Sequence, residues 1–175
     1  FPVARDESDG ERQRFGIRRI GLISRDLLLA EMMSRMAKQT LRGEITFLAS
    51  EAKDVPAIAN AHIDVVVLNS ETLGAQASMW TRRTVRFSSS PLLAMGVDND
   101  LEEAVGLIES GAAGLVTREQ GMEALADAIG RVILGEAVCS PQVMRAVFAR
   151  LAERSRDAVT REIDPEPVLS QKERQ

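Results

Sequence analysis

Residues 62–70 have the sequence HIDVVVLNS, in which a run of apolar and β-branched side chains stops at an asparagine. Such a run is typical of a strand buried on both faces of a parallel sheet. Polar groups that follow strands of this kind usually face a ligand crevice at the carboxyl edge of the sheet. Asn69 is therefore the first candidate site residue. Its amide either holds the surrounding loops in one conformation, which we favour, or contacts a ligand.

Two arginines follow other predicted strands. Arg25 comes soon after RRIGLI, and Arg118 comes directly after GLVT. Two cations near the amino termini of helices are an attractive anion site. The more common arrangement is that such arginines pair with nearby carboxylates. The candidate carboxylates are those of Asp26, Asp98 and Glu119.

The chain carries no recognisable catalytic pattern. His62 has no serine, cysteine or carboxylate partner in a known arrangement. Cys139 is the only cysteine, which excludes a disulfide framework and a thiolate metal site. The glycines of GVDND and GAAG lack the spacing of a dinucleotide-binding loop. We expect no enzymatic activity, no catalytic residue, no cofactor and no metal.

Composition narrows the class of protein further. The 175 residues suit one domain with extensions, and a hydrophobic content of 45% with only 3% aromatics predicts an aliphatic core. The net charge of −4 gives no electrostatic case for nucleic-acid binding by this piece. Without a signal peptide or long apolar segment, we expect a cytoplasmic protein with no membrane partner.

Periodicity predicts five strand-then-helix units. The strands are expected at 18–23, 44–49, 62–69, 91–97 and 114–117. The first helix begins at Ser24 or a neighbour, contains core-facing Met32, Met33 and Met36, and ends at Gly43. Further helices are expected at 54–61, within 71–90 in poor or shortened form, from Leu101 to Gly111, and at 122–134. The fold class is α/β, a flavodoxin-like doubly wound parallel sheet of five strands with helices on both faces.

The remaining sequence predicts a carboxyl-terminal helix. Ser140 and Pro141 form a strong helix start, and the following apolar residues lie on one face that packs on the domain or pairs with a partner. These residues are Val143, Met144, Val147, Phe148 and Leu151. The expected divisions are a flexible leader at 1–16, the domain at 17–137, a linker helix at 138–155, a linker at 156–168 and the start of another domain at 169–175.

Several motifs together resemble a bacterial response regulator of the NarL/FixJ (LuxR) type. IDVVVLN is similar to the third strand of its CheY-like receiver domain, and GLIESGAAGLVTRE to the stretch that ends in a functional lysine. LSQKERQ, at 169–175, resembles the opening of a LuxR-type helix-turn-helix domain. The resemblance spans about 17–175.

The same resemblance identifies the positions that perform phosphotransfer in receivers. The two acids that hold Mg²⁺ are matched by Ser24 and Arg25, and the phospho-accepting aspartate by Asn69. The hydroxyl residue, the aromatic switch and the lysine are matched by Gly96, Leu115 and Arg118. An amide is not a competent phosphoryl acceptor, and Arg25 places positive charge where Mg²⁺ should bind.

The resemblance therefore implies an atypical, aspartate-less receiver that regulates a DNA-binding transcriptional regulator without phosphorylation. Implied partners are a second copy of the chain and, through the carboxyl-terminal domain, DNA. The expected dimer surfaces are the fourth and fifth helices with the fifth strand, or the helix at 140–151. The alternative is a small-molecule or anion sensor that uses the former phosphorylation crevice, with a ligand that contacts Arg25, Asn69 and Arg118; a protein partner is a further option.

Overall fold

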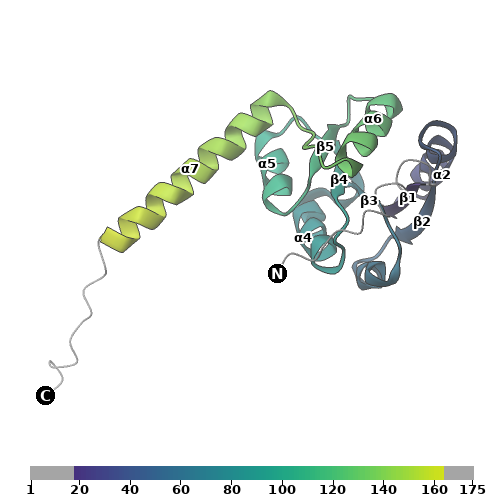
Figure 1. Ribbon diagram of the computed structural model, residues 1–175, viewed down its shortest axis with the longest axis horizontal. Coiled ribbons are helices and arrows are strands. Elements are labelled where there is room, and N and C mark those ends of the chain that lie inside the picture. Colours follow the sequence, from purple (N-terminus) through teal and green to yellow (C-terminus); the bar gives the residue numbers. More distant parts are fainter. Residues whose placement is uncertain (1–17, 164–175) are drawn as a thin grey trace, which may run out of the picture.

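The structure, a computed structural model, describes residues 18–163, with side chains as far as 158. Its five strands form one parallel sheet in the order β2-β1-β3-β4-β5 (Figure 1). The strands are β1 (Arg18–Ile23), β2 (Gly43–Ala49), β3 (Val65–Asn69), β4 (Leu92–Val97) and β5 (Gly114–Thr117). This order confirms the flavodoxin-like, doubly wound fold predicted from the sequence.

Helices cover both faces of the sheet. One face carries α2 (Leu27–Met36), the π-helix η1 (Ala37–Leu41) and α6 (Met122–Ile133). The other carries the 3₁₀ helix η2 (Ala52–Asn60), the short α3 (Ser70–Leu73) and η3 (Gly74–Gln76), then α4 (Ala77–Phe87) and α5 (Leu101–Glu109). The chain ends its described part with α7 (Pro141–Ile163).

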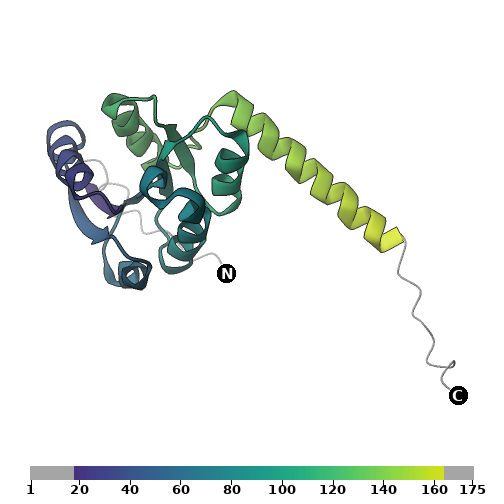
Figure 2. The same ribbon diagram turned by 180° about the vertical axis from the view of Figure 1, so that it is seen from behind.

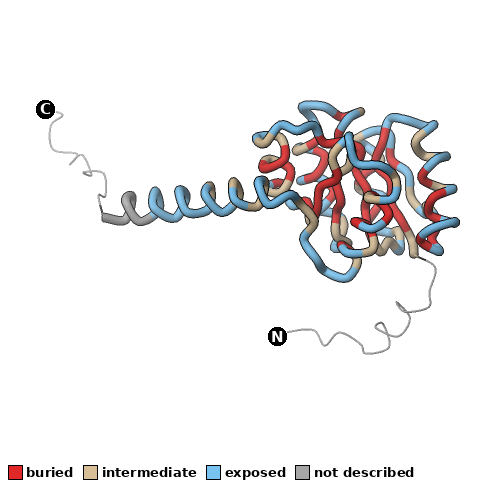
Figure 3. The backbone as a smooth tube through the Cα atoms, turned by 90° about the horizontal axis from the view of Figure 1, so that it is seen from above, coloured by how far each residue is buried: buried red, intermediate tan, exposed pale blue. Residues whose placement is uncertain are grey.

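The core consists of two aliphatic layers separated by the sheet. In β3, Val65 and Val67 pack toward α2 and α6, whereas Val66 and Leu68 pack toward α4 and α5. Every residue of β3 is buried, and the buried residues of the domain lie in its interior (Figure 3). The predicted aliphatic core is therefore present, with Trp80 as the one large aromatic among its fully buried side chains.

The helix after β1 differs from the prediction at both ends. Asp26 is its N-cap, since its carboxylate accepts hydrogen bonds from the backbone N–H of Leu28 and Leu29 at 2.9 and 3.1 Å. The helix continues as η1 and ends at Arg42, which takes a left-handed φ of 49°, so Gly43 already belongs to β2. Met32 is 48% exposed and does not face the core, unlike its two neighbouring methionines.

The prediction of a poor helix within 71–90 was wrong for α4, which is regular over 11 residues. Its buried face contains Thr81 and Thr84, whose polarity hides the helical pattern in the sequence. Both hydroxyls donate to helix carbonyls one turn earlier, at 2.9 and 2.8 Å. The helix predicted at 54–61 is instead 3₁₀, with Pro56 inside it, and proline cannot donate an α-helical hydrogen bond.

Helix α7 leaves the domain on the side of α5, away from α2 and β2 (Figures 1 and 2). It extends to Ile163 rather than ending at 155 as predicted, so residues 156–163 of the expected linker are helical. Neither glycine nor proline interrupts the sequence between Pro141 and Pro165, which explains its length. The predicted leader at 1–16 and the stretch at 169–175 lie outside the described residues.

The root of α7 is joined to the edge of the sheet. Val138 forms a parallel bridge with Gly114 in β5, and the N–H of Leu115 donates to the carbonyl of Val138 at 2.6 Å. A Cβ on Gly114 would lie 2.9 Å from Leu93 Cδ1 and 3.1 Å from Val138 Cβ. The absence of a side chain at this position lets the segment before α7 lie against β5.

We predict that Gly114→Ala destabilises the protein by about 1–3 kcal/mol, because the added methyl overpacks this junction. Gly130→Ala is the matched control, since Gly130 lies inside α6 and a Cβ there meets only Arg18 Nη1 at 3.5 Å; it should leave stability unchanged or raise it by up to about 1 kcal/mol. Urea unfolding measures both values. Equal unfolding midpoints for the two variants would contradict the close approach at Gly114.

Candidate functional site

The carboxyl ends of β1 and β3 meet in a buried polar contact. Asn69 Nδ2 donates to Ser24 Oγ at 3.3 Å, and the same oxygen accepts from the N–H of Asp26 at 3.0 Å. Both side chains are almost fully buried, with 3% and 1% exposed. Asn69 Oδ1 has no hydrogen-bond partner among the described residues. Asn69 therefore ties the β1 loop to β3 with its donor and leaves its acceptor unused.

Gly96 closes this crevice from β4. Its φ of +68° is left-handed, and the ladder between β4 and β5 shifts register around it. A Cβ there would lie 3.1 Å from Asn69 Oδ1 and 3.2 Å from Glu71 Cβ. Glycine thus satisfies two requirements at once, a backbone conformation that other residues avoid and a close approach to Asn69.

Arg118 is held by acids at the rim of the crevice. Its guanidinium lies 3.4 Å from Glu71 Oε1 and 3.1 Å from Asp98 Oδ1. Asp98 was one of the predicted partners, whereas Glu71 was not anticipated. A cavity of about 470 Å³ opens beside Arg118 and Gly96. Its lining includes four carboxylates and one guanidinium, contributed by Glu71, Asp98, Asp100, Glu103 and Arg118.

Arg25 points to a different partner from those expected. Its guanidinium donates to Gln76 Oε1 at 3.1 Å and lies 5.5 Å from the centroid of the Trp80 ring. A cation over an aromatic face is a favourable arrangement. Its backbone N–H also donates to Thr72 Oγ1 at 3.4 Å. Arg25 therefore joins the loop after β1 to α3, η3 and α4, and its side chain is spread over α4.

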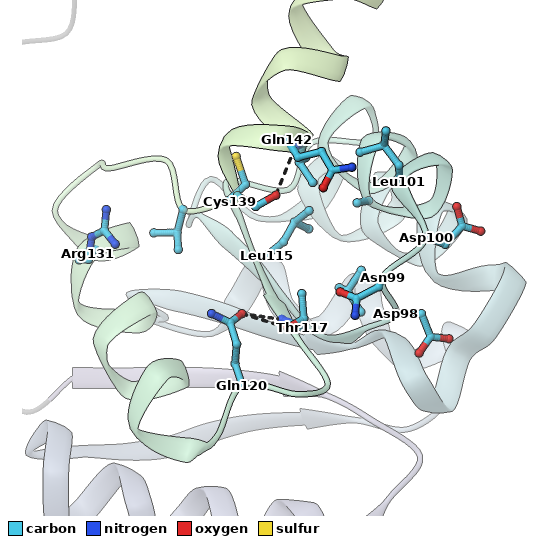
Figure 4. A pocket seen from close by; sticks show the side chains of 15 residues that line it. Asp98, Asn99, Asp100, Leu101, Leu115, Thr117, Gln120, Arg131, Cys139 and Gln142 are labelled. Carbon is cyan, nitrogen blue, oxygen red and sulfur yellow. Dashed lines mark hydrogen bonds between the residues drawn. The ribbon is translucent and has the colours of Figure 1, made fainter.

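Leu115 does not belong to the crevice. It is 6% exposed, packs in the core layer of α4 and α5, and lines a second cavity of about 490 Å³ (Figure 4). Val97 and Thr117, the last residues of β4 and β5, also line this second cavity. The structure thus brings Ser24, Asn69 and Gly96 together with Arg118 at the rim, and it separates Leu115 from them.

Neither a family model nor a curated protein matches the chain. Solved structures do match. A LuxR-family two-component response regulator from Aurantimonas sp. SI85-9A1 is 19% identical, covers 78% of this chain and 99% of its own, and has a TM-score of 0.65. The signal receiver domain of a NarL response regulator from Mycobacterium tuberculosis is 15% identical, with coverage of 70% and 100% and a TM-score of 0.60.

A LuxR-family DNA-binding response regulator from Silicibacter pomeroyi is 16% identical, with coverage of 75% and 99% and a TM-score of 0.58. At these identities the likeness concerns the fold alone. The described chain has the receiver fold.

The residues present do not fit the Mg²⁺ ion that phosphorylated receivers use. Magnesium prefers several oxygen ligands, usually including carboxylates. Around Asn69 the structure offers a hydroxyl and an amide; Asp26, two residues after Ser24, caps α2, and Glu71, two residues after Asn69, pairs with Arg118. Within 18–163, no group of three or more histidine, cysteine or acidic side chains is placed to hold a metal ion. No helix in that range is long and apolar enough to cross a membrane.

Sequence reasoning missed the neighbours that hold the crevice together. Thr72 Oγ1 donates to the carbonyl of Asn69 at 3.3 Å, and Ser70 Oγ donates to Glu103 Oε1 at 2.7 Å. The signal was present, because SET directly follows the buried strand. These contacts connect β3 with α3 and α5, so the helical turn that directly follows Asn69 is bonded on both sides.

We predict that Asn69→Asp destabilises the protein at pH 7, because it places a charge in a buried site next to a hydroxyl. Burial raises the pKa of such a carboxyl above its unfolded value. The folded variant then binds more protons than the unfolded one, so its stability falls as the pH rises through this interval. Urea unfolding at pH 4 and pH 7 should show a deficit that is larger at pH 7, by about 1–3 kcal/mol.

The control for this substitution is Asn60→Asp, since Asn60 is exposed at the end of η2. It should change stability little at either pH. A variant Asn69→Asp as stable as the wild type at pH 7 would show that the crevice accepts a carboxylate without cost.

Proposed function

We propose that the chain is a regulatory pseudo-receiver domain of a DNA-binding transcriptional regulator, which controls output by dimerisation or interdomain contacts without aspartyl phosphorylation. The observation that carries the proposal is Asn69, fixed by Ser24 at the end of β3 in a receiver fold. The place of a phosphoryl acceptor is taken by an amide that is already used as a structural hydrogen-bond donor.

The surroundings of Asn69 support the same function. The cation at the rim, Arg118, is bound between Glu71 and Asp98, and Arg25 lies on Gln76 and Trp80. These contacts give the loops after β1, β3 and β5 a set of partners that require no phosphoryl group. We infer that the domain holds one conformation and that regulation acts through its surfaces. The DNA-binding part of the proposal rests on the resemblance of residues 169–175.

We predict that beryllofluoride or acetyl phosphate with Mg²⁺ leaves the chain unchanged, because it lacks both the acceptor and the metal ligands. Phosphate-affinity electrophoresis and sedimentation velocity should show the same mobility and the same sedimentation coefficient with and without the reagents. A receiver that retains its aspartate serves as the positive control. A mobility shift that persists in the wild type and disappears in Asn69→Ala would refute the proposal.

Helix α7 offers a surface for dimerisation. One of its faces is tied to α5, since Arg150 and Arg154 lie 3.3 and 2.9 Å from the carboxylate of Glu109. The hydrogen bonds of Arg150 to Glu102 and Glu109 raise the pKa of its guanidinium, the bond to Glu102 contributing most. A second face follows alternating spacings of four and three residues. It consists of Met144, Phe148, Leu151, Ser155 and Ala158.

The large apolar side chains of this second face are exposed to solvent. Phe148 is 62% exposed and Leu151 is 52% exposed. Spacings of four and three residues are those of the contact positions in a coiled coil, and the small residues further along permit close approach of two helices. We therefore place the dimer contact on α7, the second of the two surfaces expected from the sequence, with a second copy of the chain as the partner.

We predict that Phe148→Asp weakens dimerisation at least about tenfold, which corresponds to 1.4 kcal/mol, because it puts a charge in the helix pair. Ala149→Asp is the matched control, one residue along α7 and outside the second face. Sedimentation equilibrium of the full chain measures both. A wild-type chain that stays monomeric over the accessible concentrations would exclude α7 as a dimer surface. Equal weakening of dimerisation by both variants would show that the added charge, and not its position on the second face, causes the effect.

The cavity beside Gly96 favours a second candidate function, a small-molecule or anion sensor that uses the crevice. Its volume suits a small ligand, although the four carboxylates in its lining weigh against an anion. Thermal-shift measurements with phosphate on the wild type, Arg25→Ala and Arg118→Ala distinguish the two functions. Stabilisation by phosphate that both variants lose would favour the sensor, and its absence favours the first proposal.

A further inference from the structure

The cavity of about 490 Å³ lies where β5 meets α5 and the start of α7 (Figure 4). Its lining includes Ala104 from α5, Leu115 from β5 and Val143 from α7. Its volume falls in the range of small-molecule sites, which are mostly apolar with a few polar groups. Neither Asn69 nor Gly96 belongs to its lining, but Asp98 and Asp100 line both this cavity and the one beside Gly96, so the two adjoin at the loop after β4.

The inner wall of the cavity is apolar. Val97, Ala104 and Leu115 are buried, and Val138 and Val143 are half-buried around them. No aromatic side chain contributes to the lining. These short aliphatic side chains, from β4, α5, β5 and the start of α7, do not fill the junction and leave an apolar inner wall.

Neutral polar groups surround the opening. Gln120 Oε1 accepts from the N–H of Thr117 at 2.8 Å, and Asn99 Nδ2 donates to Glu119 at 3.0 Å. Gln142 lies at the amino end of α7, on the other side of the opening (Figure 4). Side-chain amides both donate and accept hydrogen bonds, so these residues suit the amide or hydroxyl edge of a ligand.

The charged groups of the lining already have partners. Asp98 pairs with Arg118 at 3.1 Å, and Arg131 pairs with Glu136 at 2.7 Å. Asp100 caps α5 by accepting from the N–H of Glu102 at 2.9 Å. A charged ligand would lose its hydration in the cavity, and the charged groups there are already bound to other residues. The carboxylates of Asp98 and Asp100 would in addition repel an anion.

We propose that this cavity binds a small uncharged molecule with an apolar body and a hydrogen-bonding edge. The ligand would contact both β5 and residues 138–143, which connect the sheet to α7. Ser140 Oγ caps α7 by accepting from the N–H of Val143 at 3.2 Å. Because both residues line the cavity, the ligand lies against the first turn of this helix. Its occupation therefore stabilises one seating of α7 on α5. The binding site stands by itself, whereas its regulatory use rests on the proposed function.

Benzamide is a suitable probe, with benzoate and benzylammonium as anionic and cationic counterparts of similar size. Methyl NMR of the full chain should show saturable shifts of Val97, Leu115 and Val143 with benzamide in the millimolar range, as expected for so small a ligand. Benzoate should bind at least tenfold more weakly. Benzylammonium should also bind more weakly than benzamide.

Leu115→Phe fills the hollow and should remove the shifts of Val97 and Val143. Leu134→Phe is the matched control, because Leu134 is 77% exposed and lies outside the lining; benzamide should bind it as it binds the wild type. A urea unfolding curve establishes that each variant is folded. If Leu115→Phe does not fold, Ala104→Val takes its place, because it narrows the same cavity from α5.

Absence of saturable shifts with all three probes would overturn the site, as would benzamide binding that a folded, filled variant retains. Benzoate binding as tightly as benzamide would overturn the uncharged ligand class. Sedimentation of the wild type with saturating benzamide tests the regulatory use separately. A changed dimerisation constant supports it, and an unchanged constant with intact benzamide binding contradicts it while the site itself stands.

Discussion

The burial of β3 on both faces is the constraint on which the rest of the structure depends. Val65 and Val67 pack into one aliphatic layer, and Val66 and Leu68 pack into the other. A shift of one residue would exchange the two sets of side chains between unequal layers, so the register of this strand is strongly fixed. Asn69 is thereby held at the carboxyl edge between β1 and β4, where Ser24 and Gly96 are its neighbours.

Once Asn69 is fixed, its electrostatic surroundings follow from the loops around it. The crevice centre is neutral, and the charges lie at its rim as exposed pairs between Arg118 and the acids. Pairs of this kind contribute only about 0–1 kcal/mol each. They therefore orient the loops more than they stabilise the fold, and the free energy that holds Asn69 in place comes from the two core layers.

The parts of the structure that depend on periodicity were predictable from the sequence. The five strands follow from apolar runs, and helices on both faces of a parallel sheet follow from right-handed crossover connections. The helix α4 was not, because Thr81 and Thr84 bury hydroxyls whose partners are the helix's own carbonyls. The pattern of apolar and polar residues in a sequence does not reveal that a buried hydroxyl bonds to a carbonyl of its own helix.

The candidate site was predictable in its positions but not in its contacts. Ser24, Asn69 and Gly96 meet because parallel strands end at one edge. Arg25 leaves that edge for Trp80, and Leu115 turns to the second cavity, since side-chain direction depends on packing between elements that sequence spacing does not describe. In both cases the contact is with helices that are separated from the residue in the sequence, which are α4 for Arg25 and α5 and α7 for Leu115.

Helix α7 is the element through which such local packing acquires a large effect. Its 23 residues span about 34 Å at 1.5 Å per residue. A rotation of about 10° at its root would move its far end by about 6 Å over this length. Its contacts with the domain include the bridge at Gly114 before its start, the ion pairs of Arg150 and Arg154 with Glu109, and the residues that line the second cavity. Because the first two are bonds within the chain, the lining of the cavity is the contact that a molecule from outside can change.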